Sequence, residues 1–181
     1  MTDLPAEHDA FLQDALGSLS PRQRTLFALG CAEHVRYYLE DEESLAEAVR
    51  AALDVMWGTV SGLSVEPEQF DGARVAISEL CDNDDEEIET DLLQPLFAVD
   101  YAFDTVTEPA EIQGARYASS SGIATAHYAD MEDEDGKDLE VLWQRELLRR
   151  VSAHGDLPAS RDVFADLFDV VPPWMAFTPR G

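Results

Sequence analysis

The amino-acid sequence predicts an all-α fold, a single-domain bundle of about seven helices in which neighbours along the chain are mostly antiparallel. Apolar residues recur at spacings of three and four nearly everywhere, which is the period of an amphipathic helix. No stretch alternates between apolar and polar residues over the length of a strand. The stretches between the helical patterns are short, and short connections favour antiparallel neighbours.

One domain accounts for the whole chain, residues 1–181, because 181 residues of which 45% are hydrophobic can bury a single core. Within it, residues 1–19 contain a short N-terminal helix over about residues 6–16. Residues 171–181 are rich in proline and aromatic residues, so we expect an irregular tail that packs against the body of the domain.

The second helix has a clear start signal. Ser20 is a favoured cap, Pro21 suits the first turn, and Gln23 can return a hydrogen bond in a capping box. We expect this helix to continue to about Leu39.

The third helix is predicted to begin at a second capping box, in which Ser44 is the cap and Glu47 returns the hydrogen bond. It contains the clearest amphipathic stripe of the chain. The stripe consists of Leu45, Ala48, Val49, Ala52, Leu53, Met56, Trp57 and Val60. Gly62 lies near its end, where glycine favours termination.

The same spacing predicts four further long helices. They cover about residues 67–80, 92–106, 108–131 and 139–151. Pro95 falls within the first turns of the second of these and would move its start later, because proline lacks the N–H that a helix interior needs. Gly155 closes the fourth, and Ser160 is the predicted cap of a last helix.

Charge is the strongest feature of the composition. Asp and Glu number 38 against 12 Lys and Arg, which gives a formal net charge of -26. Such a charge repels phosphate and anionic lipid and attracts basic proteins, so we expect neither nucleic acid nor a membrane as partner. The acid gathers in two blocks, from which we take as candidate partner-binding residues Asp82, Asp84, Asp85, Glu86, Glu87, Asp133, Glu134 and Asp135.

The acidic blocks have two interpretations, which the sequence leaves open. Lys137 is the only lysine, and such a composition is typical of a GC-rich or salt-adapted proteome, in which surface acid is general. Alternatively, the blocks mask or bind a basic protein, as small acidic immunity or antitoxin proteins do.

The two cysteines indicate a reducing compartment. Cys31 and Cys81 lie in predicted helices and form no CxxC pair, so we interpret them as free thiols. Residues 1–17 lack the pattern of a signal peptide, and no apolar run approaches the length of a membrane helix. We therefore expect a cytoplasmic protein.

Motifs for metal and group-transfer chemistry are missing from the sequence. An EF-hand loop around Gly136 would need oxygen ligands where Met131 and Leu142 stand, and the other acidic block has Glu87 in place of the required glycine. No histidine follows a carboxylate by three residues, and no HExxH, Walker, GxGxxG or GxSxG motif occurs. We predict no metal and no cofactor, and we favour a protein that is not an enzyme.

Polar residues within or beside the apolar stripes are the candidates for a ligand pocket. They are Arg50, Asp54, Asp100, Arg116, His34 and His127. Arg50 and Asp54 are four residues apart, the spacing of a helical ion pair. A buried Asp100 needs a partner, for which Arg50 and Arg116 are available. The structural interpretation is a paired core network, and the functional one is a polar pocket around Asp100, Asp54 and His127.

The order of several short segments resembles the YjaG-like family of bacterial proteins, an all-helical domain of unknown function. The best match is Arg50–Trp57, which resembles the family's R-x-x-L-D-x-x-W segment. Weaker matches, in the same order as in the family, are Phe27–Glu33, Pro95–Asp104, Ser119–Thr125 and Trp143–Leu148. The resemblance implies a helical fold and no reaction, because the family carries no assigned activity.

The leading hypothesis is a non-enzymatic helical module that binds a basic protein through its acidic blocks. The first alternative is an enzyme or small-ligand binder that uses the pocket around Asp100, Asp54 and His127. The second alternative is a structural homo-oligomer, with Trp174 and Phe177 of the tail as its interface.

Overall fold

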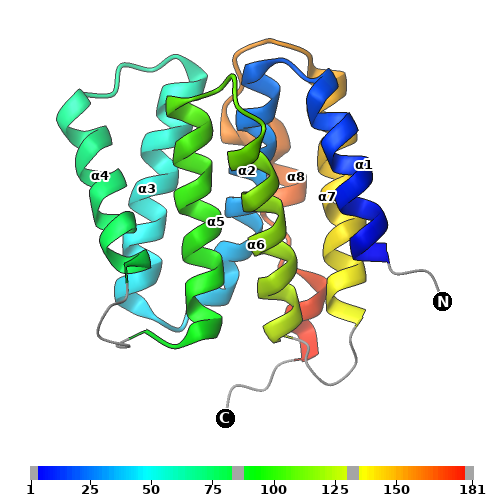
Figure 1. Cartoon of the computed structure of the whole chain (residues 1–181). Helices are drawn as coiled ribbons and strands as arrows, with labels where there is room; N and C mark the ends of the chain where they lie inside the picture. Colours follow the sequence, from blue (N-terminus) through cyan, green and yellow to red (C-terminus); the bar gives the residue numbers. More distant parts are fainter. Residues whose placement is uncertain (1–3, 83–87, 130–134, 178–181) are drawn as a thin grey trace.

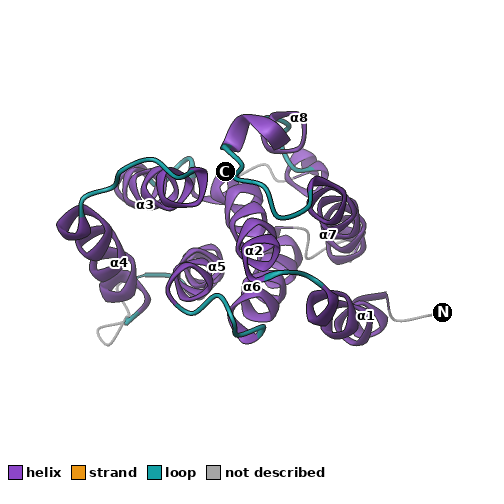
Figure 2. Ribbon diagram, turned by 90° about the horizontal axis from the view of Figure 1, so that it is seen from above, coloured by secondary structure: helices purple, strands orange, loops and turns teal. Residues whose placement is uncertain are grey.

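A computed structural model describes residues 4–82, 88–129 and 135–177 of the chain. Over these ranges the chain forms eight α-helices and no strand, which confirms the prediction of an all-α bundle (Figures 1 and 2). The α-helices are α1 (Leu4–Ser18), α2 (Pro21–Val35), α3 (Glu43–Ser61), α4 (Pro67–Cys81), α5 (Thr90–Thr107), α6 (Gln113–Ala129), α7 (Asp135–His154) and α8 (Ala165–Phe168). Three short 3-10 helices are η1 (Arg36–Leu39), η2 (Arg161–Phe164) and η3 (Pro173–Phe177).

The long helices run alternately up and down the bundle, as Figure 1 shows. Helix α2 lies at the centre and contacts α3, α5, α6, α7 and α8. Because neighbours surround it, nearly every residue from Gln23 to Val35 is buried, polar ones included. Helices α3 and α4 lie on one side of this centre and α1 and α7 on the other (Figure 2).

The stripe predicted for α3 forms part of the main apolar core, and a second, smaller cluster lies around Tyr38 and Trp174. Seven of the eight stripe residues are buried and Ala48 is partly buried. Helix α4 contributes less, because Ile77 is its one fully buried residue. Burial of these apolar side chains is the main stabilising term for the fold.

The predicted start of α2 is confirmed in detail. The Gln23 backbone N–H donates to Ser20 Oγ at 3.2 Å, and the Ser20 backbone N–H donates to Gln23 Oε1 at 2.9 Å. The predicted capping box of α3 is wrong. That helix begins at Glu43, and its N-cap Glu42 makes no side-chain capping bond.

Other helix boundaries also differ from the predictions. Helix α2 ends at Val35, and the residues up to Leu39 form the 3-10 helix η1. Helix α7 begins at Asp135, earlier than predicted, and Ser160 precedes the 3-10 helix η2 without a side-chain capping bond.

Helix α5 begins at Thr90, so Pro95 lies inside the helix and does not delay its start. Helix α6 begins at Gln113 rather than at Glu108. The predicted closing glycines are confirmed, because Gly62 and Gly155 have φ angles of 82° and 75°, in the left-handed region that glycine adopts readily.

The C-terminal tail packs on the body of the domain, as predicted. Its 3-10 helix η3 contacts α6 and α7. Trp174 is fully buried, with an exposed fraction of 0%, so its proposed role in a homo-oligomer interface is wrong. The Phe177 side chain lies outside the described residues.

Candidate functional site

The alternation of helix direction brings together, at one end of the bundle, the helix ends that three acidic connections join. Residues 40–42 join η1 to α3, residues 82–89 join α4 to α5, and residues 130–134 join α6 to α7. The helix ends that they join lie at the lower end of the bundle in Figure 1. We call the described parts of these connections, together with the first turns of α3, α5 and α7, the acidic end.

The two ends of the bundle differ sharply in charge. In sequence, the three connections at the acidic end have 13 Asp or Glu among 16 residues. The four connections at the opposite end, 19–20, 62–66, 108–112 and 155–160, have 4 among 18. Neither set contains Lys or Arg. A general acidic bias would load both ends, since both sets of connections lie between helices at the surface.

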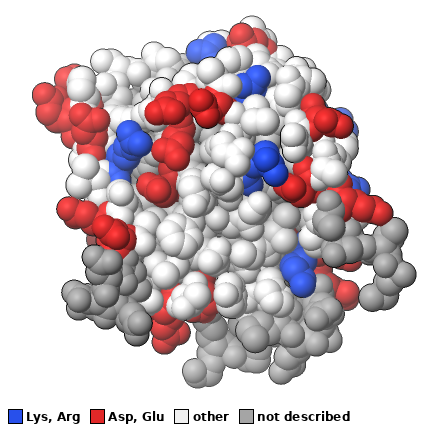
Figure 3. Space-filling view, viewed as in Figure 1, with Lys and Arg blue, Asp and Glu red and all other residues white. Residues whose placement is uncertain are grey.

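The described acids of this end are open to solvent. Glu40, Asp41, Glu42, Asp82 and Glu89 are all exposed. The hydroxyl of Tyr38 in η1 donates to Asp91 Oδ2 in the first turn of α5 at 2.7 Å, which ties η1 to the start of α5 at this end. Figure 3 shows that acid also occurs elsewhere on the face in view, beside large uncharged areas.

Most of the predicted partner-binding residues fall outside the described part of the chain. These are Asp84, Asp85, Glu86, Glu87, Asp133 and Glu134. The structure places the other two: Asp82 is exposed just after α4, and Asp135 is exposed in the first turn of α7. Helices α3, α5 and α7 begin at this end, and one or two carboxylates near each N-terminus are stabilising. The sequence of this end contains more carboxylates than the helix N-termini require.

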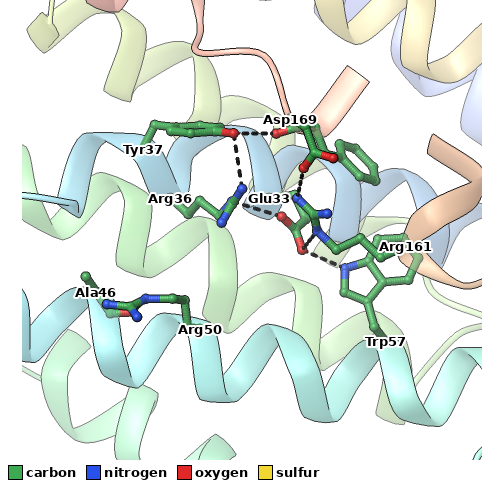
Figure 4. Close-up of polar contacts among 9 residues, drawn as sticks. Glu33, Arg36, Tyr37, Ala46, Arg50, Trp57, Arg161 and Asp169 are labelled. Atoms are coloured by element: carbon green, nitrogen blue, oxygen red, sulfur yellow. Dashed lines mark hydrogen bonds and ion pairs between the residues drawn. The ribbon is translucent and has the colours of Figure 1, made fainter. Parts of the chain in front are cut away.

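Of the six predicted pocket residues, Arg50 and Asp54 lie beside a cavity of about 410 Å³. Both are exposed, and the cavity is also lined by Glu33, Arg36, Leu53, Arg161 and Asp169. The expected ion pair between Arg50 and Asp54 does not form. Instead Arg50 Nε donates to the Ala46 carbonyl oxygen at 3.1 Å (Figure 4).

Glu33 is the centre of this site and was missed by the sequence analysis. Its side chain is only 3% exposed, and Oε1 accepts hydrogen bonds from Trp57 Nε1 at 2.9 Å and from Arg161 Nε at 3.1 Å. Arg36 Nε lies 3.0 Å from Oε2 as an ion pair (Figure 4). The one signal in the sequence was a carboxylate, next to His34, within the mostly apolar second half of α2.

His34 belongs to a separate buried network. Its Nδ1 lies 2.7 Å from Glu140 Oε2, and its ring stacks on Trp143 with centroids 3.7 Å apart. Glu140 also accepts from Trp174 Nε1 at 3.0 Å and from Gln144 Nε2 at 2.9 Å. His34 is therefore part of a hydrogen-bonded core, which is the structural interpretation.

The pKa of Glu140 reflects this environment. Complete burial alone would raise it, because a carboxylate loses its hydration in the core. The contact with His34 and the hydrogen bonds from Gln144 and Trp174 outweigh burial and hold the pKa below its usual value.

Asp100 lies on α5, away from Arg50 and Arg116. Burial raises its pKa, the negative charge of Asp104 raises it further, and Arg74 opposes both. The predicted partners are wrong, since Arg50 bonds to its own helix and Arg116 pairs with Asp9 at 3.1 Å.

The predicted pocket around Asp100, Asp54 and His127 does not form at the cavity beside Asp54. Neither Asp100 nor His127 lines that cavity. His127 is partly buried on α6, and its Nδ1 has no hydrogen-bond partner.

No described residues form a cluster of three or more His, Cys, Asp or Glu side chains suited to a metal ion. Across the described helices, none combines the length and hydropathy required to cross a bilayer. Comparisons with protein-family models, with curated proteins and with solved structures found no match to this chain.

Proposed function

We propose that this protein is a non-enzymatic binding module for a basic protein partner, which docks on the acidic end of the bundle. One observation supports the proposal above all. In sequence, the three connections between the helix ends at this end of the bundle have 13 Asp or Glu among 16 residues, whereas the connections at the opposite end have 4 among 18.

The asymmetry argues for a directed interaction over a general proteome bias. Charge that serves only solubility or salt adaptation has no reason to prefer one end of the bundle. Concentrated charge of one sign steers a partner of opposite sign and fixes its approach. The hydrogen bond between Tyr38 and Asp91 fixes η1 against the start of α5, so part of this end is preorganised.

The remaining parts of the proposal follow from the same features. The charge disfavours nucleic acid and anionic membranes as partners. Cys31 and Cys81 are both free, which agrees with a cytoplasmic protein. Membership of the YjaG-like family is proposed from the sequence resemblance alone, and it adds no activity. A homo-oligomer interface at the tail gains no support from Trp174, because this residue is buried.

The test compares two triple variants that change the net charge equally. The first, Asp41→Asn, Asp82→Asn and Glu89→Gln, neutralises described residues of the acidic end. The second, Glu66→Gln, Glu108→Gln and Glu111→Gln, neutralises the opposite end and is the matched control. All six side chains are exposed, and none makes a side-chain hydrogen bond or an ion pair with another residue of the described part of the chain.

A fluorescent oligolysine peptide serves as the probe, titrated at about 0.15 M salt so that distant charges are screened. We expect the first variant to weaken binding by about tenfold or more and the second by less than about twofold. Equal weakening by both variants would overturn the proposal, because it would show that bulk charge alone attracts the peptide.

A further inference from the structure

The lining of the cavity beside Glu33 includes no residue of the acidic connections and unites segments that are distant in sequence. Glu33 and Arg36 come from the end of α2 and from η1, Arg50 and Asp54 from α3, and Arg161 from η2. Asp169, just after α8, completes the wall. Its volume of about 410 Å³ is within the range of small-molecule sites.

The buried part of the lining is an ordered array of charge. Figure 4 shows Arg36 and Arg161 approaching the Glu33 carboxylate from different sides. Arg161 Nη2 also donates to Asp169 Oδ1 at 2.7 Å. Arg36 Nη2 donates to the Tyr37 hydroxyl at 3.1 Å. These contacts hold the guanidinium groups in place before any ligand arrives.

The Glu33 carboxylate is already bound by protein groups. Oε1 accepts from Trp57 Nε1 and from Arg161 Nε, and Oε2 lies 3.0 Å from Arg36 Nε in an ion pair. Because Oε2 is buried, Glu33 orients the two arginines and does not itself contact a ligand.

Two ions on the rim are without a partner of opposite charge. Arg50 donates only to the Ala46 carbonyl oxygen, and no contact of the Asp54 carboxylate is recorded among the described residues. Arg50 therefore has guanidinium N–H groups for an anion, and Asp54 has carboxylate oxygens for a cation. Both charges lie on the same wall of the cavity, one turn of α3 apart.

The charge of the lining is balanced, which restricts the ligand further. Three arginines face three carboxylates, namely those of Glu33, Asp54 and Asp169. A ligand with net negative charge would meet the repulsion of a chain of net charge -26. A ligand with only positive charge would leave the Arg50 guanidinium unused and would approach two further arginines.

We infer that this cavity binds a small zwitterion, a molecule of amino-acid size with one carboxylate and one ammonium group. The carboxylate lies against the guanidinium of Arg50, and the ammonium group donates to Asp54. The lining shares no residue with the acidic end, and this binding does not require the proposed basic partner.

The test begins with ligand-observed NMR of the full-length chain against each standard amino acid, followed by calorimetric titration. We expect at least one to bind with a Kd below about 1 mM. The deaminated acid and the decarboxylated amine of that amino acid are expected to bind at least about tenfold more weakly, since each leaves one charged group of the site unpaired.

Variants then locate the site. Arg50→Gln and Asp54→Asn should each weaken binding by about tenfold or more. The controls Arg149→Gln and Asp14→Asn change exposed residues of α7 and α1 and should leave the affinity unchanged. All four positions are exposed, so circular dichroism should report the same fold for each variant.

Three outcomes would overturn the inference. They are no binding by any amino acid at about 10 mM, equal binding of the deaminated acid, and equal effects of site and control variants. The second outcome would instead identify a simple anion site.

Discussion

At the scale of single residues, the most constrained side chain is Glu140. It is completely buried and contacts His34 of α2, Gln144 of its own helix α7 and Trp174 of η3. Removing the charge of a buried carboxylate leaves its hydrogen-bond donors poorly paired in the core. The resulting loss of stability is usually larger than the net stabilisation that the intact network provides.

We therefore expect Glu140→Gln to lower the free energy of unfolding by about 2–4 kcal/mol. Urea denaturation at pH 7 measures the change. Asp138→Asn, exposed on the same helix, is the control and should change it by less than about 0.5 kcal/mol. A loss of similar size in both variants would contradict the assigned network.

The raised pKa of Asp100 makes a prediction about pH. A carboxyl whose pKa is higher in the folded state binds more protons there, so it lowers stability as pH rises from the unfolded value of 3.8 through the folded one. We expect Asp100→Asn to unfold at a higher temperature than the parent at pH 7. At pH 3, where the parent carboxyl is protonated in both states, the two should coincide. An equal difference at both pH values would contradict this cause.

At the scale of helices, periodicity located every long helix, because burial of one apolar face is a property that the sequence carries. Helix ends were predicted only where the signal is local. The Ser20 capping box depends on four consecutive residues, whereas the start of α3 at Glu43 depends on where the preceding 3-10 helix η1 ends and in which direction the chain leaves it. Ser44 has the signature of a cap but does not act as one.

The contrast between the two serines is testable. Ser20→Ala removes a formed capping box and should lower stability by about 1 kcal/mol. Ser44→Ala removes a signature without a capping bond and should lie within about 0.5 kcal/mol of the parent. Thermal unfolding of both variants decides the matter, and an equal loss would mean that the assigned caps are wrong.

The candidate sites were predictable to different degrees. Arg50 and Asp54 could be predicted as neighbours because they lie four positions apart on one helix. Arg161 was not, because 128 residues separate it from Glu33, and only the folded chain brings them together. The acidic blocks were visible in the sequence, but the helix ends that they join lie at one end of the bundle only because the helices alternate in direction.

At the scale of the whole molecule, a net charge of -26 opposes the compact state. Salt screens this repulsion, so we expect raising NaCl from about 0.1 M to about 1 M to stabilise the fold. A gain of about 1 kcal/mol corresponds to a rise of roughly 2–4 °C in Tm for a chain of this size. Calorimetry at both salt concentrations measures it, and a Tm that falls with salt would show that attractive ion pairs dominate.

Backbone NMR of the full-length chain, titrated with the oligolysine peptide at about 0.15 M salt, tests the proposed docking surface most directly. Chemical shift changes should concentrate in residues 38–47, 88–91 and 135–139, where η1, α3, α5 and α7 meet the acidic connections. Changes spread evenly over both ends of the bundle, or centred on the connections 62–66 and 108–112, would contradict it.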